Sequence, residues 1–210
     1  MNIIQNYLSI KNYINNLDTN IDLIVVTKNQ EIDNIKILLD HGHLSFGENK
    51  VQDAISKWDV ILKNYKNINL HLIGKLQSNK AKEAFNIFNC IHSLDNEKLA
   101  NIFSNLEKSN NKHISYFIQV NIGNESQKNG IQINLLPDFI KYCRLDLKLN
   151  ILGLMCIPPA NQIPDPYFKK LKDLNEVNNF KYLSMGMSSD FKSAISLGST
   201  HVRIGSAIFN

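Results

Sequence analysis

Eight short apolar runs, separated by segments of helical character, constrain the fold of this chain more than any other feature. Between the runs, apolar residues recur every three or four positions, as Val51, Ile55, Trp58 and Leu62 do within residues 48–63, and this spacing is typical of an amphipathic helix. Strands that alternate with helices predict parallel βαβ units. The expected strands are residues 22–27, 43–46, 68–74, 88–94, 115–122, 150–157, 181–187 and 200–205.

The pattern within the runs indicates how the strands are covered. Several runs carry apolar residues at both alternating positions, which is expected when both faces of a sheet are buried. Eight such units predict an α/β fold, a single closed (β/α)8 TIM barrel near the small end of its size range of about 200–400 residues. An open doubly wound sheet is the alternative, because periodicity does not reveal closure. No linker, low-complexity segment or internal repeat is evident, so we expect one domain over residues 1–210.

Composition and charge argue against several classes of protein. No apolar run approaches the roughly 18–20 residues that a membrane-spanning helix needs, and the N-terminal sequence lacks the basic start and continuous apolar core of a signal peptide. We therefore expect a cytoplasmic protein without a membrane partner and, with no second domain evident, a monomer. The formal net charge is +4, but the lysines are scattered singly, which argues against nucleic acid as a partner.

The spacing of the cysteines argues against a disulfide framework and a thiolate metal cluster. Cys90, Cys143 and Cys156 are odd in number and include no C-x-x-C pair. We expect three buried free thiols and no metal site.

Glycine and serine residues follow the last two expected strands, in "SMGMSSD" and "VRIGSAIF". In TIM barrels the loops after the seventh and eighth strands commonly hold a phosphate group. Gly205 would let the backbone approach a ligand, while hydroxyl groups and free N–H groups at two helix starts would bind an anion. The hydroxyl groups belong to Ser188, Ser189 and Ser206. Ordinary helix capping is the alternative for each loop.

Two cationic residues stand at the ends of the first and last expected strands, which are neighbours in a closed barrel. Lys28 shares its alternation with Ile24 and Val26, so its amine reaches the barrel mouth if that set points inward. A site for pyridoxal 5′-phosphate (PLP) would need three features: a lysine that attacks the aldehyde, a cradle for the phosphate group and a cation that faces the ring nitrogen. Lys28, the two serine-containing loops and Arg203 could supply them. A surface lysine whose stem packs on apolar neighbours is the alternative.

Ordered blocks over nearly the whole chain resemble the pyridoxal phosphate homeostasis proteins, also called the YggS/PROSC family. The blocks are "VVTKNQ" at 25–30, "FGENKVQ" at 46–52, "HLIGKLQSNK" at 71–80, "IHSLD" at 91–95, "VNIGNESQKNGI" at 120–131, "GLMCIPP" at 153–159, "LSMGMSSD" at 183–190 and "STHVRIGSAIF" at 199–209. The fold of this family is a barrel similar to the N-terminal domain of alanine racemase.

The resemblance implies roles for individual residues. Lys28 would form a Schiff base with PLP and Arg203 would face its pyridine nitrogen. Asn49 would lie beside the ring and Met185 near the ring or the phosphate loop, with helix capping and core packing as their respective alternatives. Residues that would lie near the phosphate are Ser188, Ser189, Gly205 and Ser206. His201 has the same alternation as Arg203 and is expected inside the barrel as a hydrogen-bonded core histidine.

The same resemblance favours a PLP carrier or regulator over an enzyme. An arginine opposite the ring nitrogen disfavours ring protonation, and alanine racemase compensates with a second acid/base tyrosine from a separate domain and partner subunit. We expect no such domain here, and therefore a role in intracellular PLP (vitamin B6) homeostasis without conventional catalysis. PLP-dependent apoenzymes would be transient acceptors, and Lys128 could offer a second amine during exchange. The alternatives are a racemase-like PLP enzyme and a sugar-phosphate enzyme without PLP.

Overall fold

The computed structural model describes residues 2–17 and 20–210, and its strands form a closed parallel barrel. Each strand pairs with its neighbour in sequence, and β8 pairs with β1 to close the ring. The strands are β1 (Asp22–Val26), β2 (Ser45–Glu48), β3 (Asn69–Leu72), β4 (Cys90–Leu94), β5 (Ser115–Gln119), β6 (Asn150–Met155), β7 (Tyr182–Met187) and β8 (His201–Ile204). The predicted TIM barrel is confirmed. Seven strands lie within the runs predicted for them, whereas β2 begins inside the predicted run 43–46 and ends two residues beyond it, at Glu48.

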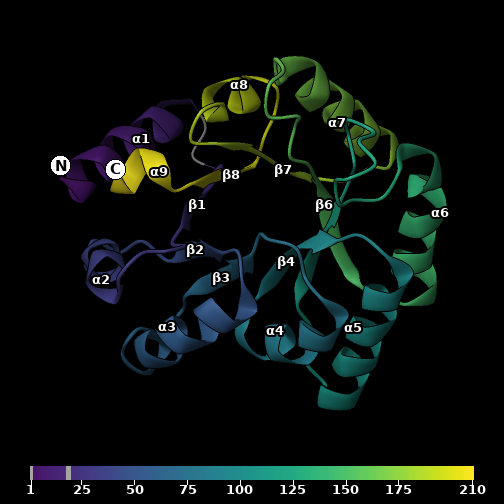
Figure 1. Cartoon of the computed structure of the whole chain (residues 1–210), viewed down its shortest axis with the longest axis horizontal. Helices are drawn as coiled ribbons and strands as arrows, with labels where there is room; N and C mark the ends of the chain where they lie inside the picture. The colour runs from purple at the N-terminus through teal and green to yellow at the C-terminus, as the bar shows by residue number, and fades with distance from the viewer. Residues whose placement is uncertain (1, 18–19) are drawn as a thin grey trace.

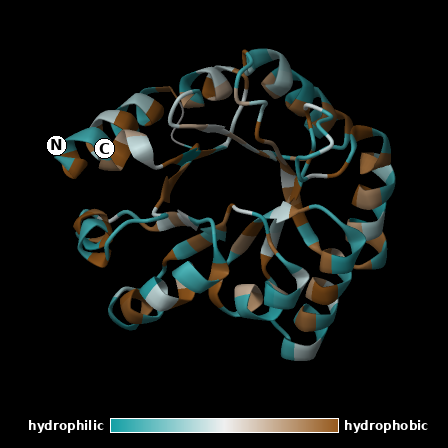
Figure 2. Ribbon diagram, in the orientation of Figure 1, coloured by the Kyte–Doolittle hydropathy of each residue, from teal (hydrophilic) through white to brown (hydrophobic). Residues whose placement is uncertain are grey.

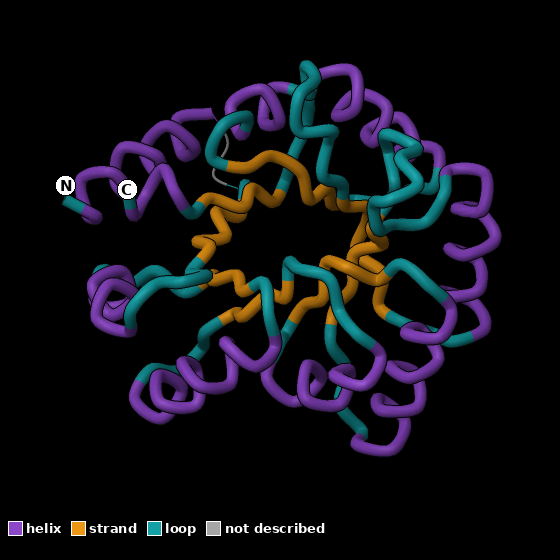
Figure 3. The backbone as a smooth tube through the Cα atoms, in the orientation of Figure 1, coloured by secondary structure: helices purple, strands orange, loops and turns teal. Residues whose placement is uncertain are grey.

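Helices surround the barrel on its outside (Figures 1 and 3). They are α1 (Ile3–Leu17), α2 (Ile32–Asp40), α3 (Val51–Asn64), α4 (Ala81–Ile87), α5 (Glu97–Asn110), α6 (Leu136–Lys141), α7 (Asp165–Val177), α8 (Phe191–Ser196) and α9 (Ser206–Phe209). Short helical turns at Ser78–Lys80, Ile133–Leu135 and Tyr142–Asp146 extend the connections. Helix α1 packs beside α9, where the Asn6 side chain donates a hydrogen bond to the Ile208 carbonyl at 3.1 Å.

The main hydrophobic core lies between the barrel and its helices. Helix α3 shows why: Val51, Ala54, Trp58 and Ile61 recur on one face and are buried, while most of its other residues are polar. The surrounding helices carry both hydrophobic and hydrophilic residues, as expected for a layer with one buried side (Figure 2). The barrel is therefore covered on its outer face by apolar contacts, as the double-sided pattern of the strands predicted.

The barrel interior differs from the main core because much of it is polar. A small apolar cluster contains Cys90, Phe117 and Met155, with Leu152 and Tyr182 against it. Interiors of this fold are usually filled by branched apolar side chains. Buried polar groups need hydrogen-bond partners, so these residues must satisfy one another inside the barrel. Polar residues that bond to one another there include Asp22, Ser45, His71, His92, Ser184 and Arg203.

Two further predictions can be compared with the structure. Cys90, Cys143 and Cys156 are buried free thiols, as predicted. Among the helices of residues 2–17 and 20–210, none is long and apolar enough to cross a membrane.

Candidate ligand-binding site at the barrel mouth

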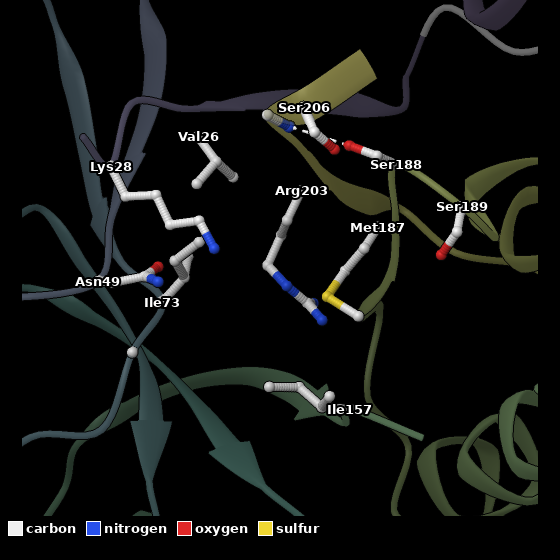
Figure 4. Close-up of a pocket in the computed structure, with 12 residues that line it drawn as sticks. Val26, Lys28, Asn49, Ile73, Ile157, Met187, Ser188, Ser189, Arg203 and Ser206 are labelled. Carbon is white, nitrogen blue, oxygen red and sulfur yellow. Dashed lines mark hydrogen bonds between the residues drawn. The ribbon is translucent and has the colours of Figure 1, made fainter. Parts of the chain in front are cut away.

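A cavity of about 370 Å³ lies at the carboxyl ends of the strands, where TIM barrels carry their sites. Its volume falls within the range of about 300–1,000 Å³ that is typical of small-molecule sites. Seven of the eight residues predicted for a PLP site line it: Lys28, Asn49, Ser188, Ser189, Arg203, Gly205 and Ser206. The remaining lining residues are Val26, Ile73, Gly74, Ile157 and Met187. Figure 4 shows the Lys28 amine and the Arg203 guanidinium projecting into the same space.

Lys28 is held at the mouth by a tight turn directly after β1. The Gln30 amide donates to the Thr27 carbonyl at 3.1 Å, and Asn29 has a φ of 58°. Asparagine tolerates this left-handed conformation better than most residues. Val26 lines the same cavity as Lys28, so their shared alternation does direct both side chains toward the interior.

A buried ionic cluster supports the strand ends that precede Lys28 and Asn49. Glu48 Oε1 accepts hydrogen bonds from Thr27 Oγ1 at 2.7 Å and from the indole nitrogen of Trp58 at 3.1 Å. Lys57 Nζ lies 2.6 Å from Glu48 Oε1 and also donates to the Thr27 carbonyl at 2.7 Å. Sequence reasoning missed this cluster. The signal was a carboxylate, Glu48, directly after an apolar run and ahead of a helix with adjacent Lys57 and Trp58.

Arg203 places a buried positive charge at the floor of the cavity. Its guanidinium donates through Nη1 to Ser184 Oγ at 2.6 Å and through Nη2 to the Cys156 carbonyl at 2.9 Å. Only 3% of the residue is exposed, and burial lowers the pKa of the guanidinium. Within the described residues it forms no ion pair with a carboxylate, although the charge of Asp190 partly opposes the lowering of its pKa. A buried cation without a paired carboxylate is costly. An electron-rich ligand atom in the cavity would reduce this cost.

The loops after β7 and β8 form a small cradle of hydroxyl and N–H groups. Ser188 Oγ accepts from the backbone N–H groups of Gly205 and Ala207, each at 3.3 Å. A side chain at position 205 would place its Cβ 3.0 Å from the Val26 carbonyl oxygen, so glycine allows β8 to approach β1 closely here. N–H groups beside hydroxyl groups suit the oxygens of a phosphate.

Met185, the remaining predicted site residue, does not line the cavity. It is fully buried in the main core outside the barrel, the alternative considered from the sequence, while Met187 lines the cavity instead. Ser184 points into the barrel, so Met185 points outward by simple alternation. An irregularity then inserts one extra residue in β7 between the pairs Ser184–His201 and Met187–Arg203. Gly186, with a φ of 93°, lies within it.

Two other predicted side chains lie away from the cavity. Lys128 forms an ion pair with Glu125 at 2.7 Å and donates to the Pro158 carbonyl at 3.2 Å, so it ties two loops together. His201 stands at the start of β8, at the opposite end of the strand from the cavity, with its Nδ1 2.8 Å from Thr200 Oγ1. Its role as a hydrogen-bonded histidine inside the barrel is confirmed.

One set of three metal-ligating side chains occurs among the described residues. Donor atoms of His71, Cys90 and His92 lie within 4.8 Å of one another, deep in the barrel. His71 Nδ1 and His92 Nε2 are 2.9 Å apart and share a hydrogen bond. That hydrogen bond uses one nitrogen atom of each of the two histidine rings.

Comparison with known proteins identifies the family. The protein-family model described as "Alanine racemase, N-terminal domain" matches residues 2–210 of this chain. A pyridoxal phosphate homeostasis protein of Aquifex aeolicus is 38% identical over 78% of this chain and 75% of its own length. The protein of that name from Buchnera aphidicola is 37% identical over 90% of this chain and 86% of its own length. The chain belongs to the pyridoxal phosphate homeostasis protein family.

Solved structures agree with this family assignment. PipY of Synechococcus elongatus, solved with PLP bound, aligns with a TM-score of 0.89 and 29% identity over 99% of this chain and 100% of its own. Alanine racemase of Clostridium difficile aligns with a TM-score of 0.76 and 13% identity, over 99% of this chain and 56% of its own. This second likeness shows a shared fold between the homeostasis protein family and alanine racemase.

Proposed function

We propose that the cavity binds PLP, held covalently by the Lys28 amine, and that the protein serves PLP homeostasis as a carrier or regulator. The observation that carries the proposal is the presence of Lys28 and Arg203 in one cavity with the cradle around Ser188. PLP combines an aldehyde, a ring nitrogen and a phosphate group, and these three features match the amine, the buried cation and the cradle in turn. The PLP-bound structure of PipY supports the same ligand.

Each part of the site would perform a distinct binding task. The Lys28 amine would bind the aldehyde carbon, while Arg203, fixed by two hydrogen bonds, would donate toward the ring nitrogen. The hydroxyl groups of Ser188, Ser189 and Ser206 would hold the phosphate group, together with the Gly205 N–H, which would turn to it from Ser188 Oγ. Asn49 would orient the ring from its edge. When bound, PLP supplies a reactive aldehyde and an electron-accepting ring.

The lining of the cavity favours storage and delivery over conventional catalysis. Arg203 is permanently protonated and has no proton to give the ring nitrogen, so the ring would be a weaker electron sink. Within the described residues, the cavity is lined by no tyrosine, histidine, cysteine or carboxylate that could work as a second acid or base beside Lys28. Such a site suits a cytoplasmic monomer that passes PLP to apoenzymes.

Trapping the covalent adduct tests the proposal. The purified protein is incubated with PLP, reduced with borohydride, digested and analysed by mass spectrometry. We expect a pyridoxyl-phosphate mass on the peptide that contains Lys28, and its loss in Lys28→Ala. The matched control is Lys128→Ala, which removes a lysine paired with Glu125 outside the cavity lining and should leave the adduct unchanged.

Two results would overturn the proposal in different ways. A protein without any reducible adduct would point to a sugar-phosphate ligand. Turnover of alanine or another amino acid that disappears in Lys28→Ala would establish a racemase-like PLP enzyme and refute the carrier role.

A further inference from the structure

Six side chains form a continuous chain of hydrogen bonds through the barrel interior, from the amino end of β1 to the cavity. We call this chain the interior relay, and its members in order are Asp22, Ser45, His71, His92, Ser184 and Arg203. The relay joins strands that are far apart in sequence and ends on the guanidinium that faces the candidate ligand site (Figure 4).

The contacts at the Asp22 end define the direction of the first hydrogen bonds. Ser45 Oγ donates to Asp22 Oδ2 at 3.0 Å, so its only proton is used there. His71 Nε2, 3.3 Å from the same hydroxyl oxygen, must therefore be the donor in that contact. A neutral imidazole with its proton on Nε2 leaves Nδ1 as an acceptor. His71 Nδ1 then accepts from His92 Nε2, which lies 2.9 Å away.

The contacts at the Arg203 end require the same direction independently. Arg203 can only donate, and its Nη1 lies 2.6 Å from Ser184 Oγ. Ser184 is fully buried, so its own proton needs an acceptor. His92 Nδ1, at 2.8 Å, is the acceptor that the structure supplies. His92 is therefore protonated on Nε2, in agreement with the assignment from the other end.

The burial of the two rings is consistent with neutral histidines in this arrangement. Burial lowers the pKa of His71 to about 3. Burial, reinforced by the nearby His71, His201 and Arg203, lowers the pKa of His92 well below its usual value. Because neutral rings each have one donor and one acceptor nitrogen, each ring nitrogen in the relay has one partner in the required role, and each serine hydroxyl group donates one hydrogen bond and accepts one.

We propose that His92 and Ser184 are positioning residues for Arg203, held in one hydrogen-bonding direction by the relay to Asp22. Both Nη atoms of Arg203 are then anchored, one by Ser184 and one by the Cys156 carbonyl, which fixes the plane of the guanidinium beneath the ligand. The effect on a ligand rests on the proposed binding of PLP, whereas the direction of the relay is a property of the ligand-free protein.

Nuclear magnetic resonance of the ligand-free protein, labelled with ¹⁵N in its histidines, tests the direction first. We expect His71 and His92 to be neutral at pH 7 with their protons on Nε2. A proton on Nδ1 of His92, or Zn²⁺ bound by His71 and His92 in the purified protein, would overturn the relay. This measurement needs no substitution, so it holds even if a variant fails to fold.

Titration with PLP then tests the positioning role. His92→Leu removes the acceptor for Ser184 and is expected to raise the Kd for PLP about tenfold and to shift the absorption of the bound ligand. His92→Asn keeps a carbonyl oxygen near the position of Nδ1 and should stay within about threefold of the wild type. The matched control is Phe117→Leu, which changes a buried ring whose centroid lies 4.5 Å from that of His92 but removes no hydrogen bond of the relay.

The outcomes separate this inference from the proposed function. A wild-type protein that does not bind PLP refutes the proposed function, while the histidine tautomers still decide the relay. If the wild type binds PLP and His92→Leu binds it as tightly as Phe117→Leu does, His92 has only a packing role and the positioning proposal is wrong.

Discussion

Lys57→Met is expected to destabilise the protein strongly because it leaves a carboxylate buried without its cation. Lys57 Nζ lies 2.6 Å from Glu48 Oε1, and the two side chains are 15% and 1% exposed. The other carboxylate oxygen, Oε2, is buried and has no hydrogen-bond partner among the described residues. Removal of one partner from such a pair typically costs about 3–5 kcal/mol. We expect a loss of about that size in the free energy of unfolding.

Urea unfolding, followed by circular dichroism, measures this loss. The matched control is Lys36→Met, whose ion pair with Asp33 is solvent-exposed and should contribute less than about 1 kcal/mol. A second variant identifies the cause. Glu48→Gln, made in the Lys57→Met background, removes the unpaired buried negative charge. Its amide oxygen can still accept hydrogen bonds, so stability should recover by about 2 kcal/mol or more.

A small loss of stability in Lys57→Met would refute this reasoning. If Lys57→Met costs no more than Lys36→Met, water solvates Glu48 and the cluster does not stabilise the ends of β1 and β2. If the double variant recovers nothing, the loss comes from the methylene packing of Lys57 or its bond to the Thr27 carbonyl.

Two further predictions concern the fold. The pKa of His71 is lowered to about 3 and that of His201 to about 4, so between pH 6.5 and 5 the unfolded chain binds more protons than the folded one. Chemical denaturation should show the stability present at neutral pH falling by about 2 kcal/mol per neutral buried histidine over this window, and a flat profile would contradict the burial. Gly186→Ala should cost about 2–4 kcal/mol in the same assay, because position 186 has a φ of 93° and a Cβ there would lie 2.5 Å from that of Ala194. Gly42→Ala, with a φ of 77° and nothing within 4 Å, should cost only about 1–2 kcal/mol, and equal costs would refute the steric argument.

Most of the site could be predicted because its residues stand in short motifs at strand ends. Once eight strands close into a barrel, the first and last become neighbours, and Lys28 and Arg203 necessarily approach the same mouth. The alternation of Ile24, Val26 and Lys28 also predicted that the lysine shares its side of the strand with Val26. These inferences needed only local periodicity and one topological assumption.

Met187, which lines the cavity in place of the predicted Met185, shows where alternation fails. One extra residue in β7 reverses the side to which the following side chains point. The motif "SMGMSSD" does not by itself predict this irregularity, because its glycine is equally consistent with a phosphate-binding loop. The cluster of Glu48 and Lys57 was missed for a related reason, since its partners meet only when α3 packs on the barrel.

The sequence by itself therefore determined the eight strand–helix units, the resemblance to a family and most of the predicted residues that line the barrel mouth. Only the tertiary structure decided that the inward side chains between Asp22 and Arg203 join into a relay. Alternation shows that a side chain points inward, but the stagger of the closed strands decides which inward side chains lie at the same level. Hydrogen bonds form only within a few tenths of an ångström of their preferred length, so the relay depends on that stagger.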